Sequence, residues 1–250
     1  MHVVSAGSII KRSFAIYLKN FVPFTSVMAV MHAPIIMYVY FTLQEGPEAF
    51  ITNSQRFKII TTLGSLVLTM IATGAITYGT VKELRGQHAP LMNCIGVGFA
   101  KLFPVIGTAM LFGMALVGGF MLFIIPGIFI LCMLWLAIPA VVIEGNGGIS
   151  ALKRSRELTE GYRGQIFAIL ASLTIINLVV VKLLEHLMLS GPNTASPGAL
   201  MVHVGQTMML SFGVGILFSA ATAVANAVTY HDIRLEKEGV DAEALAAVFE

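Results

Sequence analysis

Charged residues are scarce in this chain of 250 residues. They make up 11% of the sequence, whereas 57% is hydrophobic, and soluble domains carry about 25% charged residues. A water-soluble body of this size needs more polar sequence than this to cover its surface. The composition therefore excludes an ordinary soluble domain and favours a chain whose surface faces lipid.

The residues that usually carry chemistry are also few. Cys94 and Cys132 stand alone, without CxxC or metal-ligand spacing, so we expect buried thiols. The only aspartates, Asp232 and Asp241, lie in the acidic C-terminal tail, which argues against nucleic-acid binding. No glycine-rich phosphate loop or nucleophile elbow is present. We therefore expect a protein that is not an enzyme and that uses no cofactor and no metal.

Six long apolar stretches make up most of the sequence. A membrane-spanning helix needs about 20 apolar residues. The predicted spans are 21–43, 59–81, 103–125, 128–143, 166–189 and 206–230. Pro126-Gly127 should separate the third from the fourth, because proline removes a backbone donor and glycine permits a tight reversal. The sequence predicts an all-α, polytopic membrane protein forming one membrane domain, 1–250.

A weak internal repeat accompanies the spans. Residues 8–13 (Ser-Ile-Ile-Lys-Arg-Ser) resemble residues 150–155 (Ser-Ala-Leu-Lys-Arg-Ser). The pattern predicts three units, each an interfacial helix followed by a two-span hairpin, which begin near Ser5, Pro90 and Gly148. Matches this short also arise by chance, so an alternative without internal repetition stays open.

The positive charge is distributed unevenly between the two sides of these spans. Twelve of the 15 lysines and arginines lie on the side of both termini. By the positive-inside rule, both termini and the tail 231–250 should be cytoplasmic. We expect a multi-pass protein of a bacterial inner membrane.

An amphipathic interfacial helix is predicted over residues 5–20. Its apolar stripe contains Ile10, Phe14, Tyr17, Leu18 and Phe21. Such a helix can lie in the headgroup plane, with its cations facing anionic lipid. The lipid-headgroup candidates, here and in the basic segment before the fifth span, are Lys11, Arg12, Lys153, Arg154, Arg156 and Arg163. A plain topology anchor is the alternative to a site for anionic lipid of the cytoplasmic leaflet.

The sixth span carries a strip of small and polar residues at every fourth position. Its members are Thr207, Ser211, Gly215, Ser219 and Ala223. Residues four apart share one helix face, and small residues let helices approach closely in lipid. We interpret the strip as a helix-packing surface; a homo-oligomer contact or a polar-lined lumen stays open.

Other polar residues within the spans are expensive in lipid and therefore of interest. One group should converge near the outer surface because a single loop joins the last two spans: Asn177, Lys182, Glu185, His186, His203 and Gln206. An interhelical hydrogen-bond cluster is the favoured interpretation over a zinc site. His32 and Asn226 also lie within spans, and Glu144 lies close enough in sequence to pair with Lys153 or Arg154, with proton coupling as the alternative.

Three short segments resemble a known group of proteins. They are 125–130 (Ile-Pro-Gly-Ile-Phe-Ile), 139–144 (Pro-Ala-Val-Val-Ile-Glu) and 151–158 (Ala-Leu-Lys-Arg-Ser-Arg-Glu-Leu), with 230–234 (Tyr-His-Asp-Ile-Arg) after the last span. Here the chain resembles the YciC-like bacterial inner-membrane proteins and the membrane domain attached to some glycerophosphodiester phosphodiesterases. The resemblance implies a six-span module without the soluble catalytic barrel, which alone needs about 250 residues.

Taken together, these features favour a non-enzymatic membrane protein that supports envelope or lipid homeostasis, in contact with membrane lipids. It would do so by binding or handling lipids or other amphipathic molecules. A transporter or channel for small molecules, with a polar path beside the sixth span, is the alternative.

The charge asymmetry predicts which loops are reachable from outside. A membrane-impermeant thiol reagent should label cysteine at position 54 or 193 in intact cells, and should not label cysteine at position 155. Labelling of a residue in the segment between the fourth and fifth spans would contradict the predicted orientation.

Overall fold

The computed structural model describes residues 5–46, 52–87, 89–145, 147–189 and 197–239, with the backbone alone at 188–189 and 197–204. Its elements are α1 (Ala6–Lys19), α2 (Phe21–Gln44), α4 (Ser54–Leu84), α5 (Leu91–Ala100), α6 (Leu102–Leu122), α7 (Ile124–Leu134), α8 (Ala137–Glu144), α9 (Ile149–Thr159), α10 (Arg163–Leu189) and α11 (Pro197–Glu238). Within the described residues, six stretches are long and apolar enough to cross a membrane, α7 and α8 together forming one. The predicted all-α polytopic fold is confirmed.

The element order is the same in three consecutive parts of the chain. A short helix precedes a hairpin of long helices each time: α1 before α2 and α4, α5 before α6 and α7–α8, and α9 before α10 and α11. The short helices follow Ser5, Pro90 and Gly148, the predicted starting points. At the first, the Ser5 hydroxyl accepts the Ser8 backbone N–H at 3.2 Å in a capping box, which fixes where the helix begins. Duplication of the sequence itself stays a prediction.

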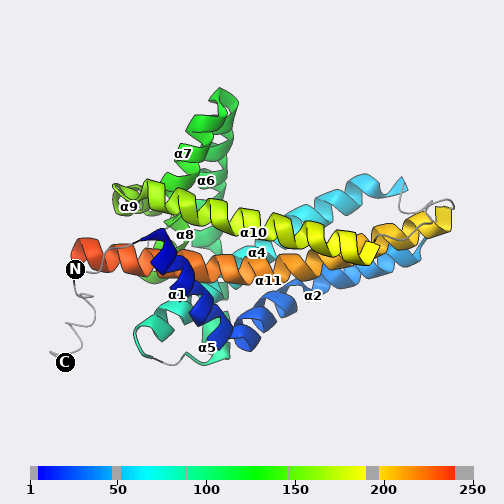
Figure 1. Ribbon diagram of the computed structural model, residues 1–250, viewed down its shortest axis with the longest axis horizontal. Coiled ribbons are helices and arrows are strands. Elements are labelled where there is room, and N and C mark those ends of the chain that lie inside the picture. The colour runs from blue at the N-terminus through cyan, green and yellow to red at the C-terminus, as the bar shows by residue number, and fades with distance from the viewer. Residues whose placement is uncertain (1–4, 47–51, 88, 146, 190–196, 240–250) are drawn as a thin grey trace.

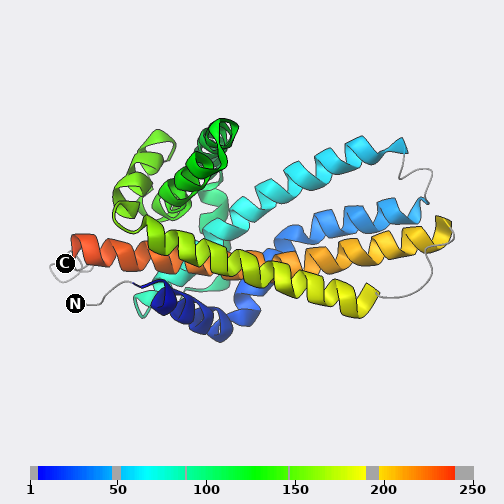
Figure 2. The same cartoon turned by 45° about the horizontal axis from the view of Figure 1, so that its top comes forward.

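The long helices α2, α4, α10 and α11 extend toward a common end of the molecule (Figure 1). The helices α1 and α9 and the C-terminal end of α11 gather at one end, which we term the basic end, while α2 and α10 run to the opposite end (Figure 1). In both views α10 and α11 lie side by side, and α4 diverges from them toward the end opposite the basic end (Figure 2). This divergence separates α4 from α10 and leaves α11 between them.

The α6–α7 hairpin projects away from the α10–α11 pair (Figure 1). Its turn lies at Phe123, which has an extended backbone, and Pro126 sits in the first turn of α7. The expected break at Pro126-Gly127 was therefore placed three residues too late, because the first turn of a helix tolerates proline. Met121 to Ile125 are 67–84% exposed and all apolar. A turn of this composition is stable against lipid rather than water.

The fourth span is broken, whereas the sequence suggested one helix over 128–143. Pro139 has no N–H for the carbonyl four residues earlier, which belongs to Trp135, and α7 ends at Leu134. Side chains from other helices donate hydrogen bonds to the main-chain carbonyls at this break. Asn226 Nδ2 donates to the Trp135 carbonyl at 3.1 Å. The hydroxyls of Ser155 and Thr159 donate to the Met133 carbonyl at 2.9 and 3.0 Å.

Two further boundaries differ from those expected. The last helix does not end at residue 230 but continues to Glu238, because Ile233 is fully buried in the core. The first eight residues of the predicted tail are therefore helical. In α1 the apolar stripe is split: Tyr17 is buried, whereas Phe14 and Leu18 are exposed. Its buried face packs on α10 and α11, so α1 is part of the bundle rather than a separate surface helix.

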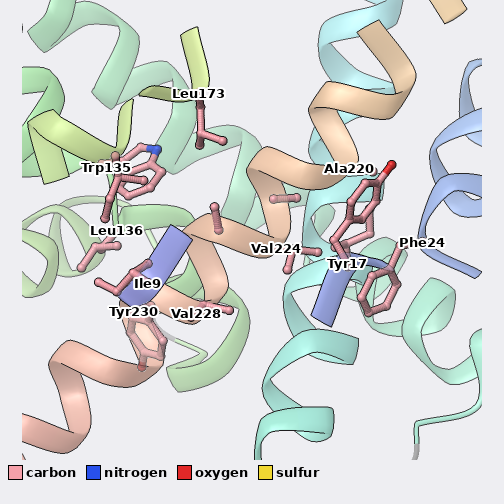
Figure 3. Close-up of a cluster of buried hydrophobic side chains, with 14 of the residues drawn as sticks. Ile9, Tyr17, Phe24, Trp135, Leu136, Leu173, Ala220, Val224, Val228 and Tyr230 are labelled. Atoms are coloured by element: carbon pink, nitrogen blue, oxygen red, sulfur yellow. The ribbon is translucent and has the colours of Figure 1, made fainter. Parts of the chain in front are cut away.

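One apolar core joins all three parts of the chain at the basic end. Ile9 from α1 lies beside Tyr230 and Val228 of α11, and Tyr17 lies near Phe24 (Figure 3). The Tyr17 hydroxyl donates to the Leu217 carbonyl at 3.1 Å. Because this hydrogen bond uses a main-chain acceptor in α11, it fixes the position of α1 along that helix.

Among the glycines that the structure describes, the closest approach to a main-chain atom of another helix lies between α4 and α5. A Cβ at Gly98 would stand 2.6 Å from the Ile71 carbonyl oxygen, whereas a Cβ at Gly96 would meet nothing within 4 Å. We expect Gly98→Ala to lower stability by about 1–3 kcal/mol through overpacking. Gly96→Ala, the control in the same helix, should be neutral or stabilising by up to about 1 kcal/mol. Thermal unfolding in detergent measures both, and equal melting would contradict the close contact.

Candidate functional site

A groove of about 450 Å³ lies along the middle of α11, between α4 and α10. We term it the α11 groove. Both flanking helices contact α11 but do not pack closely on each other, so the groove faces outward between them. Its lining residues are Thr69, Thr73, Leu170, Leu173, Thr174, Asn177, Gly215, Phe218, Ser219, Thr222, Ala223 and Asn226.

Helical spacing explains why polar groups gather in the α11 groove. Thr69 and Thr73 are four residues apart on α4, and Thr174 and Asn177 are three apart on α10. On α11, polar residues recur at 219, 222 and 226. Residues three or four apart share one helix face, so each helix presents one polar stripe to the groove. Every polar side chain in the lining is a hydroxyl or an amide, and none is charged.

A buried histidine supports one wall of the groove. His32 in α2 contacts the Met28 carbonyl through Nδ1 at 2.8 Å and the Thr69 hydroxyl through Nε2 at 3.0 Å. The carbonyl can only accept, so Nδ1 carries the hydrogen. In the tautomer that carries its proton on Nδ1, Nε2 is an acceptor and takes the hydrogen bond from the Thr69 hydroxyl. Thr69 therefore presents only oxygen lone pairs to the groove.

Asn226 is the most buried polar residue of the lining. Its side chain is 7% exposed, and its Nδ2 is held by the Trp135 carbonyl. Its Oδ1 is buried without a hydrogen-bond partner. An unpaired buried acceptor costs about 1–3 kcal/mol, so a donor that reaches this oxygen would be favoured.

The four-residue strip on α11 is partly a groove wall. Gly215, Ser219 and Ala223 line the α11 groove, whereas Thr207 and Ser211 do not. A Cβ at Gly215 would meet nothing within 4 Å. The favoured interpretation of Gly215 as a close helix contact is therefore wrong within this chain, because the neighbouring helices diverge at this level. Close contacts occur instead at Gly98 and at Gly119, whose Cβ would stand 3.1 Å from the Gly127 Cα.

The polar residues expected to converge near the outer surface are only partly placed by the side chains that the structure describes. Asn177 lines the α11 groove, Lys182 pairs with Glu185 at 2.8 Å within α10, and Gln206 is exposed. His186 also has an interaction partner, and the side chain of His203 lies outside the described residues. Among the residues that the structure describes, no three His, Cys, Asp or Glu side chains are grouped so that they could hold a metal ion.

A second polar assembly, which we term the Glu144 network, lies at the basic end. Arg154 Nε donates to both carboxylate oxygens of Glu144 at 2.8 and 3.0 Å, and its Nη2 pairs with Glu238. The Tyr230 hydroxyl donates to Glu144 at 2.7 Å. Arg234 donates to Glu238 at 3.0 Å and to the Tyr230 hydroxyl at 3.3 Å.

The Glu144 network connects α8, α9 and α11. Burial disfavours the charged form of Arg154, but the hydrogen bonds that it donates to Glu144 and Glu238 outweigh this effect and raise the pKa of its guanidinium. The expected ion pair of Glu144 with a basic residue of the next segment is present, and its partner is Arg154. Two arginines face two carboxylates, so the charges within the network balance.

The six lipid-headgroup candidates divide into two groups. Lys11, Lys153 and Arg156 are exposed and remain able to meet headgroups. The other three have partners within the chain: Arg12 pairs with Asp232 at 2.6 Å, Arg154 belongs to the Glu144 network, and Arg163 stacks over the Phe129 ring at 4.6 Å.

Burial also changes the choice of labelling position for topology. Ser155 is fully buried, so a cysteine there would resist reagents from either side. The exposed Arg156 is the informative position, and Asn193 lies outside the described residues.

Several groove residues were not candidates from the sequence alone. Thr69, Thr73, Thr174 and Thr222 are common within apolar helices, where a hydroxyl can bond to its own backbone. The available signal was their spacing of three or four residues, matched on three separate helices. That match becomes visible only when the helices are placed side by side.

The fold and the groove define a multi-pass all-α membrane protein with an uncharged polar groove halfway along its spans. A family model described as a domain of unknown function, DUF7847, matches residues 42–233, and the chain belongs to this family. The matched range contains the whole α11 groove and begins after His32. No curated protein and no solved structure matches the chain. The resemblance to YciC-like proteins stays a prediction.

Removing one hydroxyl tests the Glu144 network. Tyr230 is 1% exposed, so Tyr230→Phe leaves the partly buried Glu144 carboxylate without one of its donors. We expect a loss of about 1.5–3 kcal/mol, the range for hydrogen bonds to charged groups, measured by thermal unfolding in detergent. Tyr40→Phe, at a half-exposed position of α2, is the control. If the two variants melt together, the network does not stabilise the basic end.

Proposed function

We propose that this membrane protein binds an amphipathic molecule, most simply a lipid, in the α11 groove and so supports lipid or envelope homeostasis. The observation that carries the proposal is the groove itself. It combines hydroxyl and amide groups on its floor with Leu170, Leu173 and Phe218. Binding sites for small molecules typically have this composition, with mainly apolar walls and a few polar groups that set orientation.

The position of the α11 groove supports access from the membrane. It opens between α4 and α10, and its lining residues lie near the middle of three spanning helices. A molecule that enters sideways keeps its acyl chain in the hydrocarbon and gains hydrogen bonds for its polar group. Hydrogen bonds of this kind are strengthened by the low dielectric of the interior.

The alternative, a transporter or channel, finds less support in the same geometry. Apolar clusters lie along α11 on both sides of the groove, with Val228 and Tyr230 toward the basic end and Met208 and Phe212 toward the other end. A conducting path would need polar lining beyond these clusters. A lipid that enters the α11 groove from the surrounding membrane requires no such path.

Exposed cations at the basic end fit the same proposal. Lys153 and Arg156 on α9 are exposed, and each cation near an anionic surface contributes about 1 kcal/mol. They would hold the basic end against anionic headgroups, while the α11 groove binds a separate molecule deeper in the membrane.

Filling the groove tests the proposal. Gly215 lines the groove and Gly213 does not, and a Cβ at either position would meet nothing within 4 Å. Gly215→Leu should therefore reduce co-purified lipid to below half of the wild-type amount, without lowering the melting temperature more than Gly213→Leu does. Native mass spectrometry of protein released in mild detergent measures the bound lipid.

The matched glycine pair separates occupancy from folding. Both changes replace a glycine with leucine in the same helix two residues apart, so their effects on helix propensity are equal. Equal lipid retention by Gly215→Leu and Gly213→Leu would contradict binding in the α11 groove.

A further inference from the structure

We propose that the α11 groove selects a neutral lipid with a free hydroxyl group, which donates a hydrogen bond to the groove floor. This inference rests on the proposed function and adds the chemical class of the ligand. It follows from three properties of the lining: the absence of charge, an unpaired acceptor and a threonine whose proton is already used.

The first property excludes a charged headgroup from the groove floor. The twelve lining residues contain no Lys, Arg, His, Asp or Glu. A phosphate or carboxylate buried here would lose its hydration without gaining a counter-charge, and an ammonium group would meet the same penalty. An uncharged polar group has no such cost once it is hydrogen-bonded.

The second property requires the ligand to be a donor. The amide of Asn226 is oriented by the Trp135 carbonyl, which can only accept and therefore faces Nδ2. The oxygen Oδ1 is thereby turned away from that contact and is left buried and unpaired. An ether or ester oxygen of a ligand could not satisfy it, because both are acceptors. A hydroxyl can.

The third property adds a second acceptor to the groove wall. With the His32 proton on Nδ1, where the Met28 carbonyl accepts it, Nε2 accepts the Thr69 proton at 3.0 Å. Its hydroxyl oxygen can then only accept from the groove side. Thr69 and Asn226 come from α4 and α11, so they present acceptors from two helices to the same groove.

The test compares two ligands that differ in one hydrogen-bond donor. The probes are 1,2-dioleoylglycerol and the same molecule with its free hydroxyl converted to a methyl ether, titrated into purified full-length protein and measured by native mass spectrometry. We expect the hydroxyl form to bind about tenfold more tightly, which corresponds to about 1.4 kcal/mol. Equal affinities in the wild-type protein would overturn the inference. Tighter binding of dioleoyl phosphatidic acid than of dioleoylglycerol would also overturn it.

Variants assign the preference to residues. Asn226→Leu should reduce the ratio of the two affinities to about one. Thr69→Val, which leaves the Trp135 contact intact, should reduce it in part. Thr174→Val is the matched groove control and should preserve the ratio. Because each ratio compares two probes on the same folded protein, a lower yield of a variant does not affect it. A wild-type ratio retained in both Asn226→Leu and Thr69→Val would overturn the assignment.

The same experiment separates this inference from the proposed function. If Gly215→Leu weakens both probes but the wild-type ratio is one, the groove binds lipid and only the hydroxyl preference fails. If Gly215→Leu weakens neither probe, the groove is not the site, and the proposed function fails together with the inference.

Discussion

Backbone groups inside a membrane must find partners within the protein, because lipid offers none. The fourth span meets this requirement with difficulty, since Pro139 supplies no N–H for the Trp135 carbonyl. The solution draws in two other helices. Asn226 of α11 satisfies Trp135, and Ser155 and Thr159 of α9 satisfy Met133. The break in one helix thus positions α9 and α11, and it orients the amide that forms the floor of the α11 groove.

Small residues serve two different purposes in this bundle. At Gly98 and Gly119 the absence of a side chain lets helix backbones come together, as expected for packing in lipid. At Gly215 the same absence leaves space open, since α4 and α10 diverge there. Small residues at four-residue spacing are therefore compatible with a tight contact or with a groove, and the direction of the neighbouring helices decides which one forms.

The two ends of the molecule differ in how they are held together. At the basic end, the main apolar core and the Glu144 network tie α1, α8, α9 and α11 to one another. Further along α11, the described side chains join the helices through a smaller cluster around Ile35, Val39 and Phe57. The helices are firmly connected at the basic end and diverge toward the opposite end. This arrangement keeps the α11 groove open to the side. This arrangement suits a protein that accepts a molecule from the surrounding lipid.

Much of the architecture could be predicted from the sequence, because apolar length and residues such as Ser5, Pro90 and Gly148 that begin helices are local properties. Span number, the starts of the short helices and the ion pair of Glu144 all follow from such patterns. The turn at Phe123 and the break at Trp135 were missed, since each depends on how a proline is accommodated by its surroundings. The α11 groove could not be predicted from the sequence for a related reason. Thr69, Thr174 and Asn226 are unremarkable in their own helices, and only tertiary packing, which places three helices around a common space and leaves one amide oxygen unpaired, makes them a site.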